Sequence, residues 1–221
     1  MLVLRLADQI LDVGFAFLPK FKTEKSVNEA MSSLGSLVSL GKGAPVHLLQ
    51  PKPSLNEPPN TYSGNYGHGQ FPFHSDLAHH RHPPKYLILR CIKGHPSVTT
   101  PLIDSRVIME RVGEQELTRA LVRSRRRVRG EAPLMRLCET TTSGVRFRWD
   151  ELFLVPASEL GKQAFQMVKA EIKRQRAIEL SLANPGDTLV VDNWRMLHSR
   201  SSVPVSAVDR VVARAYLEKL Y

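Results

Sequence analysis

The sequence has no long hydrophobic run and little cysteine, and both features narrow what the chain can be. No stretch approaches the roughly 18 consecutive apolar residues that a membrane-spanning helix needs. The first residues do not combine a basic start with a long apolar segment, so they do not predict a secretion signal. The two cysteines, Cys91 and Cys138, lack metal-site spacing and have apolar neighbours. We therefore predict buried free thiols and a cytoplasmic protein that does not act at a membrane.

Nucleotide-binding signatures and internal repeats are also missing. The sequence contains neither GxGxxG nor GxxxxGK followed by Ser or Thr, which disfavours the common nucleotide-binding folds. No low-complexity linker divides the chain. Its 221 residues, of which 42% are apolar and 24% charged, predict one globular domain over residues 1–221.

Positive charge is in excess, with a formal net charge of +10. Such a balance can indicate a nucleic acid or an acidic protein as partner. Aromatic residues are not interleaved with the arginines, which disfavours a platform for single-stranded nucleic acid. A solvated helix end or hairpin is the simpler interpretation, so nucleic acid is not expected as partner. Much of the excess lies in one segment: Arg119, Arg123, Arg125, Arg126, Arg127 and Arg129.

Apolar alternation predicts a mainly β chain with flanking helices. Many strands without a βαβ rhythm favour a double-stranded β-helix, or jelly roll. A long loop, often functional in a compact domain, is expected at 51–72. The expected strands are residues 13–18, 45–50, 86–92, a hairpin over 134–155, 177–182, 188–193 and 211–220. The expected helices are residues 23–33, capped at Thr23, 105–123 and 158–174, while residues 1–10 fit a short strand or a helix start.

Two histidines and one aspartate lie where predicted strands end. His74 and Asp76 belong to the run FPFHSD, and alternate strand residues share a face. His198 follows a later apolar strand and can reach the same end of a jelly roll. Two imidazoles and one carboxylate can occupy one face of an octahedral Fe(II) ion, leaving three positions open for a co-substrate and oxygen. We therefore predict that these three residues bind a metal.

Two arginines in the run DRVVARAY support this interpretation. Strand periodicity places residues 210, 212 and 214 on one face. An arginine that faces inward is costly to bury without an anion. A dicarboxylic co-substrate offers that anion, because the planar guanidinium grips a carboxylate through two hydrogen bonds. The alternative is that Arg210 and Arg214 are surface residues of an edge strand.

Together these blocks resemble the Fe(II)/2-oxoglutarate-dependent oxygenases of the taurine dioxygenase and clavaminate synthase-like superfamily. The blocks occur in the family's order, between about residues 60 and 217. The first 60 residues carry little of the resemblance. The matching stretches are FPFHSDLAHH, PKYLILRC, TTPLID, GDTLVVDNWRMLHSR and DRVVARAYLE.

The resemblance implies a metal-dependent mechanism and assigns roles to the residues that match. His74, Asp76 and His198 are implied to bind Fe(II), with 2-oxoglutarate and O2 as co-substrates. Oxidative decarboxylation of 2-oxoglutarate to succinate and carbon dioxide is implied to drive substrate oxidation. Because Asp76 supplies the carboxylate that halogenases on this scaffold lack, a hydroxylase or desaturase is implied.

The resemblance also implies how 2-oxoglutarate is held. Arg210 matches the arginine that clamps its distal carboxylate. Thr100 matches a threonine that helps to hold the same carboxylate, with the adjacent Thr99 as an alternative. Arg214 matches a second arginine, which lies near the co-substrate or reaches an anionic group of the substrate.

Several other residues near the metal motif are candidates for weaker roles. His68 and Gln70 precede the motif in a glycine-rich loop, and His79 follows it, so all three are candidates for substrate binding. His79 belongs to a histidine-rich stretch, 79–82, that fits a surface turn better than a second metal site. Trp194 is expected to pack against the metal-site wall. The preceding Asp192 and Asn193 are expected to fix the loop that delivers His198.

Four functions remain open from the sequence. The leading one is oxidation of a small polar molecule, most simply an amino acid or a derivative, with sulfonates and betaines as competitors. A carrier-bound or macromolecular substrate is the second, because the +10 charge could bind an acidic carrier protein or nucleic acid. The third is a non-enzymatic binding domain with a degenerate site, which conflicts with the presence of every ligand and clamp residue. The fourth is a zinc hydrolase, which leaves Arg210 and Thr100 without a role. The chain is short for the group, so an open pocket, or one completed by a partner subunit in a homo-oligomer, is expected.

Overall fold

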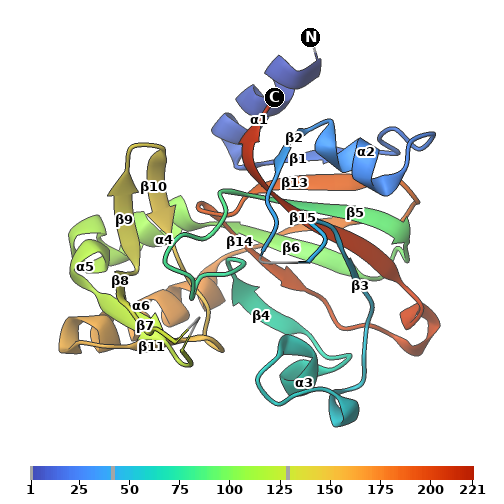
Figure 1. Ribbon diagram of the computed structural model, residues 1–221. Coiled ribbons are helices and arrows are strands. Elements are labelled where there is room, and N and C mark those ends of the chain that lie inside the picture. The colour runs from blue at the N-terminus through green and yellow to red at the C-terminus, as the bar shows by residue number, and fades with distance from the viewer. Residues whose placement is uncertain (1, 41–42, 128–129) are drawn as a thin grey trace.

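The computed structural model describes residues 2–40, 43–127 and 130–221, and Figure 1 shows two layered β-sheets with helices at their edges. No helix in these ranges is long and apolar enough to cross a membrane. The helices are α1 (Leu2–Val13), α2 (Val27–Ser32), α3 (Tyr62–Tyr66), α4 (Ser105–Val112), α5 (Glu114–Arg119) and α6 (Glu159–Arg174), with 3-10 turns at Ser54–Asn56 and Val205–Ala207. The strands are β1 (Phe15–Leu18), β2 (Gly35–Leu37), β3 (His47–Leu49), β4 (Phe71–His74), β5 (Tyr86–Lys93), β6 (Thr99–Asp104), β7 (Leu121–Ser124), β8 (Leu134–Arg136), β9 (Cys138–Thr141), β10 (Gly144–Phe147), β11 (Leu154–Pro156), β12 (Ile178–Ser181), β13 (Thr188–Asp192), β14 (Met196–Arg200) and β15 (Val211–Leu220).

The two main sheets are antiparallel and pack face to face. The larger has the order β1-β13-β5-β15-β2, with β3 also on β15, and the smaller has the order β12-β6-β14-β4. Alternate residues of β5 point to opposite sides, and consecutive residues are buried, so β5 is covered on both faces. Leu87 and Leu89 pack toward Leu102 of the smaller sheet, whereas Ile88 packs with Ile10 of α1. This mainly antiparallel arrangement confirms the predicted jelly roll with flanking helices.

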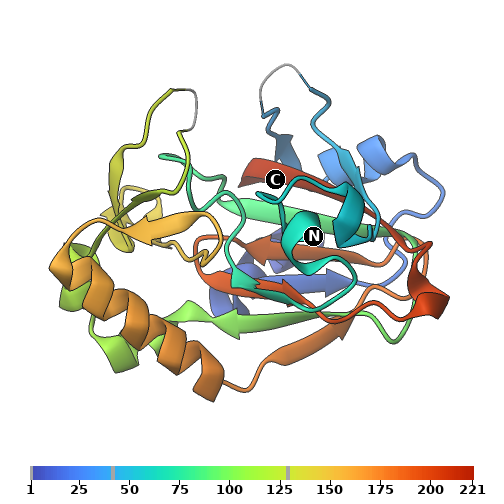
Figure 2. The same ribbon diagram turned by 90° about the horizontal axis from the view of Figure 1, so that it is seen from below.

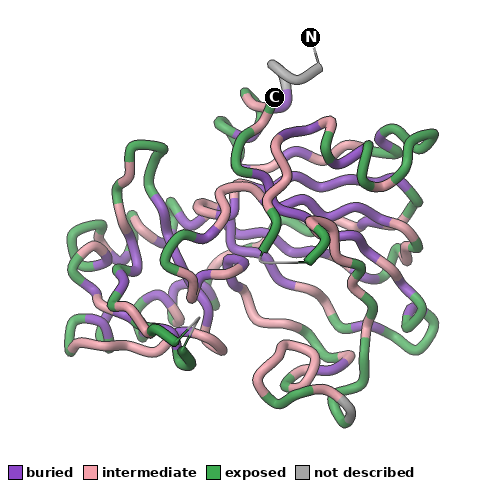
Figure 3. Tube along the Cα trace, in the orientation of Figure 1, coloured by how far each residue is buried: buried purple, intermediate pink, exposed green. Residues whose placement is uncertain are grey.

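A side unit, residues 105–174, lies beside the two sheets. It contains α4, α5, α6, the hairpin β9-β10 and the three-stranded sheet β11-β7-β8. Figure 2 shows α6 lying along this unit, away from the main sheets. Trp149 and Phe165 pack together in its core, with ring centroids 4.3 Å apart. The side unit therefore has an apolar core of its own, and Figure 3 shows buried segments in both regions.

Two predicted helices have different bounds in the structure. The first begins at Val27 instead of Thr23, because Ser26 and Glu29 form a capping box: the Glu29 N–H donates to Ser26 Oγ (3.3 Å) and the Ser26 N–H donates to Glu29 Oε2 (3.0 Å). The second, predicted over 105–123, is interrupted. Gly113, with a φ of +102°, ends α4 and starts α5, and residues from Leu121 onward form β7.

Other local predictions are corrected or confirmed. The predicted loop over 51–72 contains α3 and the start of β4. Residues 134–155 are not one hairpin: β9 and β10 form a hairpin, whereas β8 and β11 both pair with β7. The start of the chain is helical over Leu2–Val13. Cys91 and Cys138 are buried free thiols, as predicted.

Candidate metal centre

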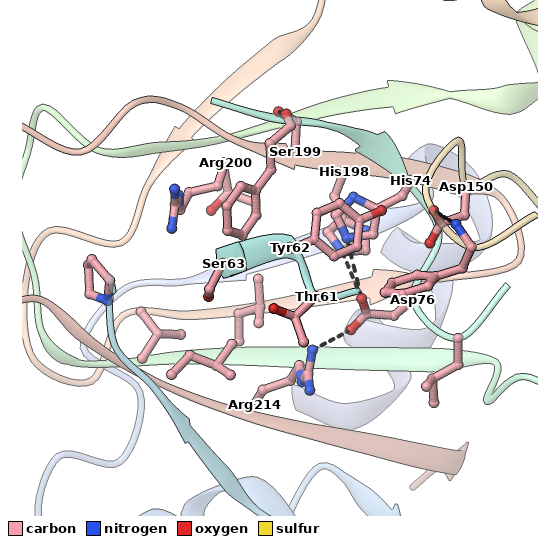
Figure 4. A pocket seen from close by; sticks show the side chains of 18 of the residues that line it. Thr61, Tyr62, Ser63, His74, Asp76, Asp150, His198, Ser199, Arg200 and Arg214 are labelled. Atoms are coloured by element: carbon pink, nitrogen blue, oxygen red, sulfur yellow. Dashed lines mark hydrogen bonds and ion pairs between the residues drawn. The ribbon is translucent and has the colours of Figure 1, made fainter. Parts of the chain in front are cut away.

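The fold brings the three predicted metal ligands together at one end of the smaller sheet. His74, the last residue of β4, is the direct cross-strand partner of His198 in β14, so the two side chains lie side by side. Asp76 Oδ1 lies 3.4 Å from His74 Nε2 and 3.5 Å from His198 Nε2. All three residues are buried, and their ligand atoms lie within 4.8 Å of one another. Figure 4 shows the three side chains directed toward one another, and one ion could contact all three.

The second oxygen of the Asp76 carboxylate is fixed from the opposite sheet. The Tyr216 hydroxyl donates a hydrogen bond to Asp76 Oδ2 (2.8 Å), and Arg214 Nη1 lies 3.3 Å from the same oxygen. Burial alone would raise the pKa of Asp76, but Arg214 and the two imidazoles outweigh burial and hold this pKa well below its usual value. Asp76 is therefore ionised, with Oδ1 directed at the imidazoles.

The main chain of Asp76 is held by Asn193. The Asp76 N–H donates to Asn193 Oδ1 (2.7 Å), and Asn193 Nδ2 donates to the carbonyls of Asp76 (3.0 Å) and Pro84 (2.9 Å). Asn193 thus supports Asp76 and ties the loop that leads to His198 to residues 76 and 84, which agrees with the prediction that it fixes this loop. Asp192 does stabilise that loop, because its carboxylate accepts the Trp194 N–H (3.0 Å).

Trp194 lies away from the metal-site wall, contrary to the prediction. Its indole Nε1 donates to the Pro83 carbonyl (2.9 Å), and the Arg146 guanidinium lies over its ring at 5.1 Å. The ring that does contact a candidate ligand is Tyr62, which stacks on His74 with centroids 4.4 Å apart.

The orientation of His74 suits a metal ligand. Its Nδ1 lies 2.9 Å from the Pro72 carbonyl, so this nitrogen carries a proton and Nε2 is the nitrogen directed at Asp76. Burial alone would lower the pKa of His74, but Asp76 outweighs burial and raises this pKa, so a bound metal ion would displace a proton from Nε2. Burial lowers the pKa of His198, which favours the neutral imidazole that metals require. Two imidazole nitrogens and one carboxylate oxygen fit Fe(II) and leave further positions open.

The candidate ligands form one wall of a cavity of about 410 Å³. From the larger sheet, Arg210, Val212, Arg214 and Tyr216 line it, in line with the predicted periodicity. Arg210 is only 7% exposed, yet its guanidinium has no hydrogen bond or ion pair with any described residue, and its Nε is buried without a partner. This side chain is therefore a buried cation that lacks an anion.

Of the two adjacent threonines, only one faces the cavity. Thr100 is 4% exposed and lines the cavity. Thr99 points elsewhere and is the register partner of Ser181 in β12. The uncertainty between the two positions is thus resolved in favour of Thr100 as the residue near the cavity.

Of the four candidate substrate residues, Arg214 and His79 line the cavity, whereas His68 and Gln70 do not. His79 lines the cavity, its ring packs on Phe153 at 4.9 Å, and its Nδ1 is buried without a partner. Burial and the neighbouring His80 lower the pKa of His79 to about 4, so the ring is neutral. His68 and Gln70 lie outside the cavity lining, and Gln70 is exposed. They follow Gly67, which ends α3 with a φ of +51°.

Asp150 and Tyr62 are among the cavity residues that the sequence did not predict. Asp150 is 1% exposed, and its Oδ1 accepts the N–H groups of Leu152 (2.8 Å) and Phe153 (2.9 Å), but no cationic side chain pairs with it among the described residues. Tyr62 has a buried hydroxyl, and burial together with the Asp150 charge raises its pKa. Neither the run FRWD nor the run TYSG carries a pattern that would have predicted these positions.

Comparisons with known proteins agree with this architecture. Neither a family model nor a curated protein matches the sequence. Solved structures do: an asparagine oxygenase in complex with Fe(II), 3-hydroxyasparagine and succinate has a TM-score of 0.72 and 19% identity, over 98% of this chain and 78% of that one. PvcB, an Fe, α-ketoglutarate (2-oxoglutarate) dependent oxygenase from an isonitrile synthetic pathway, has a TM-score of 0.70 and 14% identity, over 97% and 79%.

A third similar structure is the non-heme iron oxygenase OrfP in complex with Fe and L-canavanine. It has a TM-score of 0.66 and 16% identity, over 98% of this chain and 78% of that one. OrfP is also known in complex with Fe and α-ketoglutaric acid. At these identities the likeness shows the fold. This chain therefore has the fold of iron- and 2-oxoglutarate-dependent oxygenases, the group that its sequence motifs resemble.

Proposed function

We propose that the chain is an Fe(II)/2-oxoglutarate-dependent oxygenase that hydroxylates or desaturates an amino acid or a derivative. The observation that carries the proposal is one cavity that contains both the His74, Asp76 and His198 cluster and the unpaired buried cation of Arg210. A metal alone would explain the cluster but not Arg210, which needs an anion. The similar structures contain Fe, α-ketoglutarate or succinate, and amino acids, which supports the same co-substrate here.

The cavity residues fit the two groups that this reaction requires. The Nε2 atoms of His74 and His198 and Oδ1 of Asp76 would hold the iron. Arg210 would pair with the distal carboxylate of 2-oxoglutarate, and Thr100 would donate its hydroxyl to it. When bound, iron and 2-oxoglutarate supply the oxidising power by reducing O2, with release of succinate and carbon dioxide.

The chain's own residues position and protect this chemistry. Tyr216 and Arg214 keep Asp76 ionised and aimed at the metal position. The stacked ring of Tyr62 fixes His74 and covers it from solvent. Arg214 retains an unpaired buried Nε, so it also remains available toward the co-substrate or an anionic group of the substrate. A site held by packed side chains keeps the target C–H bond in place and water out.

Asp150 favours a substrate with a cationic group. Burial raises the pKa of Asp150, because a buried carboxylate without a cation is costly, and an ammonium or guanidinium group beside it would favour its ionised form. Tyr62 and Phe153, whose ring centroids lie 5.5 Å apart, offer aromatic faces beside it, which attract cations. The neutral ring of His79 adds one polar contact on the same side. An amino acid carries such a cation, so Asp150 and His79 are its proposed binding residues.

A zinc hydrolase or a non-catalytic binding domain fits less well. Both would leave the buried cation of Arg210 without a partner, although a metal at the cluster is common to the hydrolase and the oxygenase. The two buried free thiols also support a reducing compartment, and we infer a single cytoplasmic domain over residues 1–221.

Succinate formation tests the proposed function. The assay contains Fe(II), 2-oxoglutarate, ascorbate and air, with a panel of amino acids, and compares wild type with Asp76→Ala. We expect substrate-dependent succinate in wild type, at least 1000-fold less in Asp76→Ala (about 4 kcal/mol, for a lost metal ligand), and no change in Asp209→Ala, whose side chain is exposed on the surface. Absence of succinate in wild type, together with absence of 2-oxoglutarate binding, contradicts the proposal.

A further inference from the structure

The three-stranded sheet of the side unit has one covered face and one uncovered face. Val122, Met135 and Leu154 are buried in the core that α6 completes. The alternate residues point to the other side. There Arg123 is the cross-strand partner of Leu134, which is 63% exposed. We name this surface the arginine face; it consists of Leu121, Arg123, Leu134, Arg136 and Val155.

The cations of this surface lack anionic partners. Arg123 and Arg136, like the adjacent Arg125 and Arg126, have no carboxylate within 4.0 Å in the described part of the chain. Some surface cations elsewhere do have one: Arg106 pairs with Asp104, Arg174 with Glu171 and Lys169 with Glu151. The arginine face is therefore a region of positive charge that the chain itself does not neutralise.

Some of these arginines are held in place by the main chain. Arg136 Nη1 donates to the Thr118 carbonyl, and Arg125 Nε donates to the Leu152 carbonyl (2.8 Å). Holding a long side chain reduces the entropy lost when a partner binds. These side chains are exposed, as the interpretation of a solvated segment predicted, but two of them are also held by main-chain carbonyls.

The composition of the surface favours a protein over a nucleic acid. Segment 119–136 contains seven arginines and no lysine, and protein interfaces are enriched in arginine and depleted of lysine. Leu134 supplies an exposed apolar centre surrounded by charge, the usual anatomy of a protein contact. No aromatic residue belongs to the arginine face, so it offers no platform on which bases could stack.

The arginine face adjoins the rim of the cavity. The Arg125 N–H donates to the Phe153 carbonyl (2.8 Å), and Arg125 Nε donates to the Leu152 carbonyl. Phe153 and Asp150 both line the cavity, so one short loop joins the proposed substrate site to this surface. A partner bound here would hold a tethered group beside the cavity.

We propose that the arginine face docks an acidic protein that carries the amino-acid substrate as a covalently attached group. The proposal rests on the proposed function, because it names how that same cavity receives its substrate. Charge complementarity identifies the partner as acidic, and the exposed Leu134 identifies it as a protein with an apolar contact point. The loop that carries Asp150 and Phe153 joins this surface to the cavity, so docking would occur beside the cavity.

Binding is measured first, by fluorescence anisotropy, with a labelled acidic carrier domain that bears phosphopantetheine and with single-stranded dT20 as the competing polyanion. The test variant is Arg123→Glu/Arg136→Glu, a second is Leu134→Asp, and the control is Lys22→Glu/Lys25→Glu, which makes the same charge change near α2. We expect the carrier Kd to rise at least tenfold in both test variants and in 0.3 M salt, and to stay within twofold in the control. Equal weakening in test and control variants, or tighter binding of dT20 than of the carrier, overturns the proposal.

Turnover is measured next, with each amino acid offered free and as a thioester on the same carrier domain. We expect Arg123→Glu/Arg136→Glu to raise KM for the carrier-bound substrate at least tenfold and to leave KM for 2-oxoglutarate unchanged. Equal use of free and carrier-bound forms, with neither affected by the charge reversal, overturns the docking proposal but leaves the oxygenase intact. If the protein does not bind 2-oxoglutarate in the presence of either form of the amino acid, the proposed function is contradicted instead. The anisotropy comparison then still decides whether the arginine face docks the carrier.

Discussion

Two buried arginines near the larger sheet differ in how their charge is satisfied. Arg90 in β5 is 3% exposed and donates hydrogen bonds to the carbonyls of Phe21 (2.6 Å) and Gly186 (3.1 Å) and to Thr188 Oγ1 (2.8 Å). Arg210, which precedes β15, is 7% exposed and donates none from its side chain within the described chain. The two side chains are almost equally buried, so burial alone does not separate a structural cation from one that is free to bind a ligand. The absence of side-chain hydrogen bonds from Arg210 to any described residue separates the two.

The side unit contains another buried arginine whose terminal guanidinium nitrogen is bonded, although its Nε is not. Arg148 is 1% exposed and donates to the carbonyls of Ala78 and His80 (2.8 Å each). It thereby holds the turn that follows Asp76. We conclude that this fold bonds the terminal guanidinium nitrogens of Arg90 and Arg148 where these residues join loops to strands, and, within the described chain, leaves those of Arg210 unbonded where a co-substrate is expected.

The largest expected effect comes from Arg210→Met. Loss of the guanidinium should weaken 2-oxoglutarate binding at least 100-fold, which corresponds to about 3 kcal/mol. The free energy of unfolding should stay equal or increase, because an unpaired buried charge is removed. Titration calorimetry with the anaerobic Fe(II) protein and urea unfolding measure the two quantities. Marked destabilisation without a change in affinity would make Arg210 a structural residue like Arg90.

The matched variant Arg90→Met should show the opposite pattern. The carbonyls of Phe21 and Gly186 would lose their donor, so the free energy of unfolding should fall by about 2–3 kcal/mol. The affinity for 2-oxoglutarate should remain within twofold of wild type. Unchanged stability in urea unfolding would remove the distinction between the two arginines.

Asp150→Asn extends the comparison to a buried carboxyl group of the cavity that no cationic side chain of the described chain pairs with. We expect KM for the amino-acid substrate to rise about 10- to 100-fold, because a hydrogen bond to a charged group contributes roughly 1.5–3 kcal/mol. 2-oxoglutarate affinity should not change, since Arg210 and Thr100 remain. Steady-state kinetics with the substrate and with its deaminated analogue provide the measurement. An equal loss for both compounds would show that Asp150 does not recognise a cation.

The smallest effect concerns pH and His79. In the folded chain its pKa is about 4, below the ordinary 6.5, so the unfolded chain binds a proton in that window and the folded chain does not. Stability should therefore fall as the pH decreases from about 6.5 to about 4. His79→Asn should show a shallower fall in thermal unfolding measured across this range. An identical slope in both proteins would mean that other groups dominate.

The sequence predicted the elements that a local apolar pattern defines, and the site residues whose positions follow directly from those elements. The apolar run of β5 and the periodicity of α6 were sufficient to predict both elements. The juxtaposition of His74, Asp76 and His198 follows from strand pairing, which a jelly roll implies.

What the sequence did not predict depends on tertiary contacts. Asp150 belongs to the side unit and Tyr62 to the segment 51–72, and only packing brings both to the cavity. Similarly, Gln70 lies only four residues before His74 in the sequence, but it follows the turn at Gly67 and its side chain is exposed. The satisfaction of Arg90 and the isolation of Arg210 are visible only once hydrogen-bond partners from distant segments are in place.

The most direct test of the account is calorimetric titration of 2-oxoglutarate into the anaerobic wild-type protein, with and without Fe(II). The account predicts one molecule bound per chain when Fe(II) is present, and at least tenfold weaker binding without Fe(II) or in Asp76→Ala. Absence of binding in the presence of Fe(II), or equal binding with and without the metal, would contradict the claim that the histidine–aspartate cluster and Arg210 form one site.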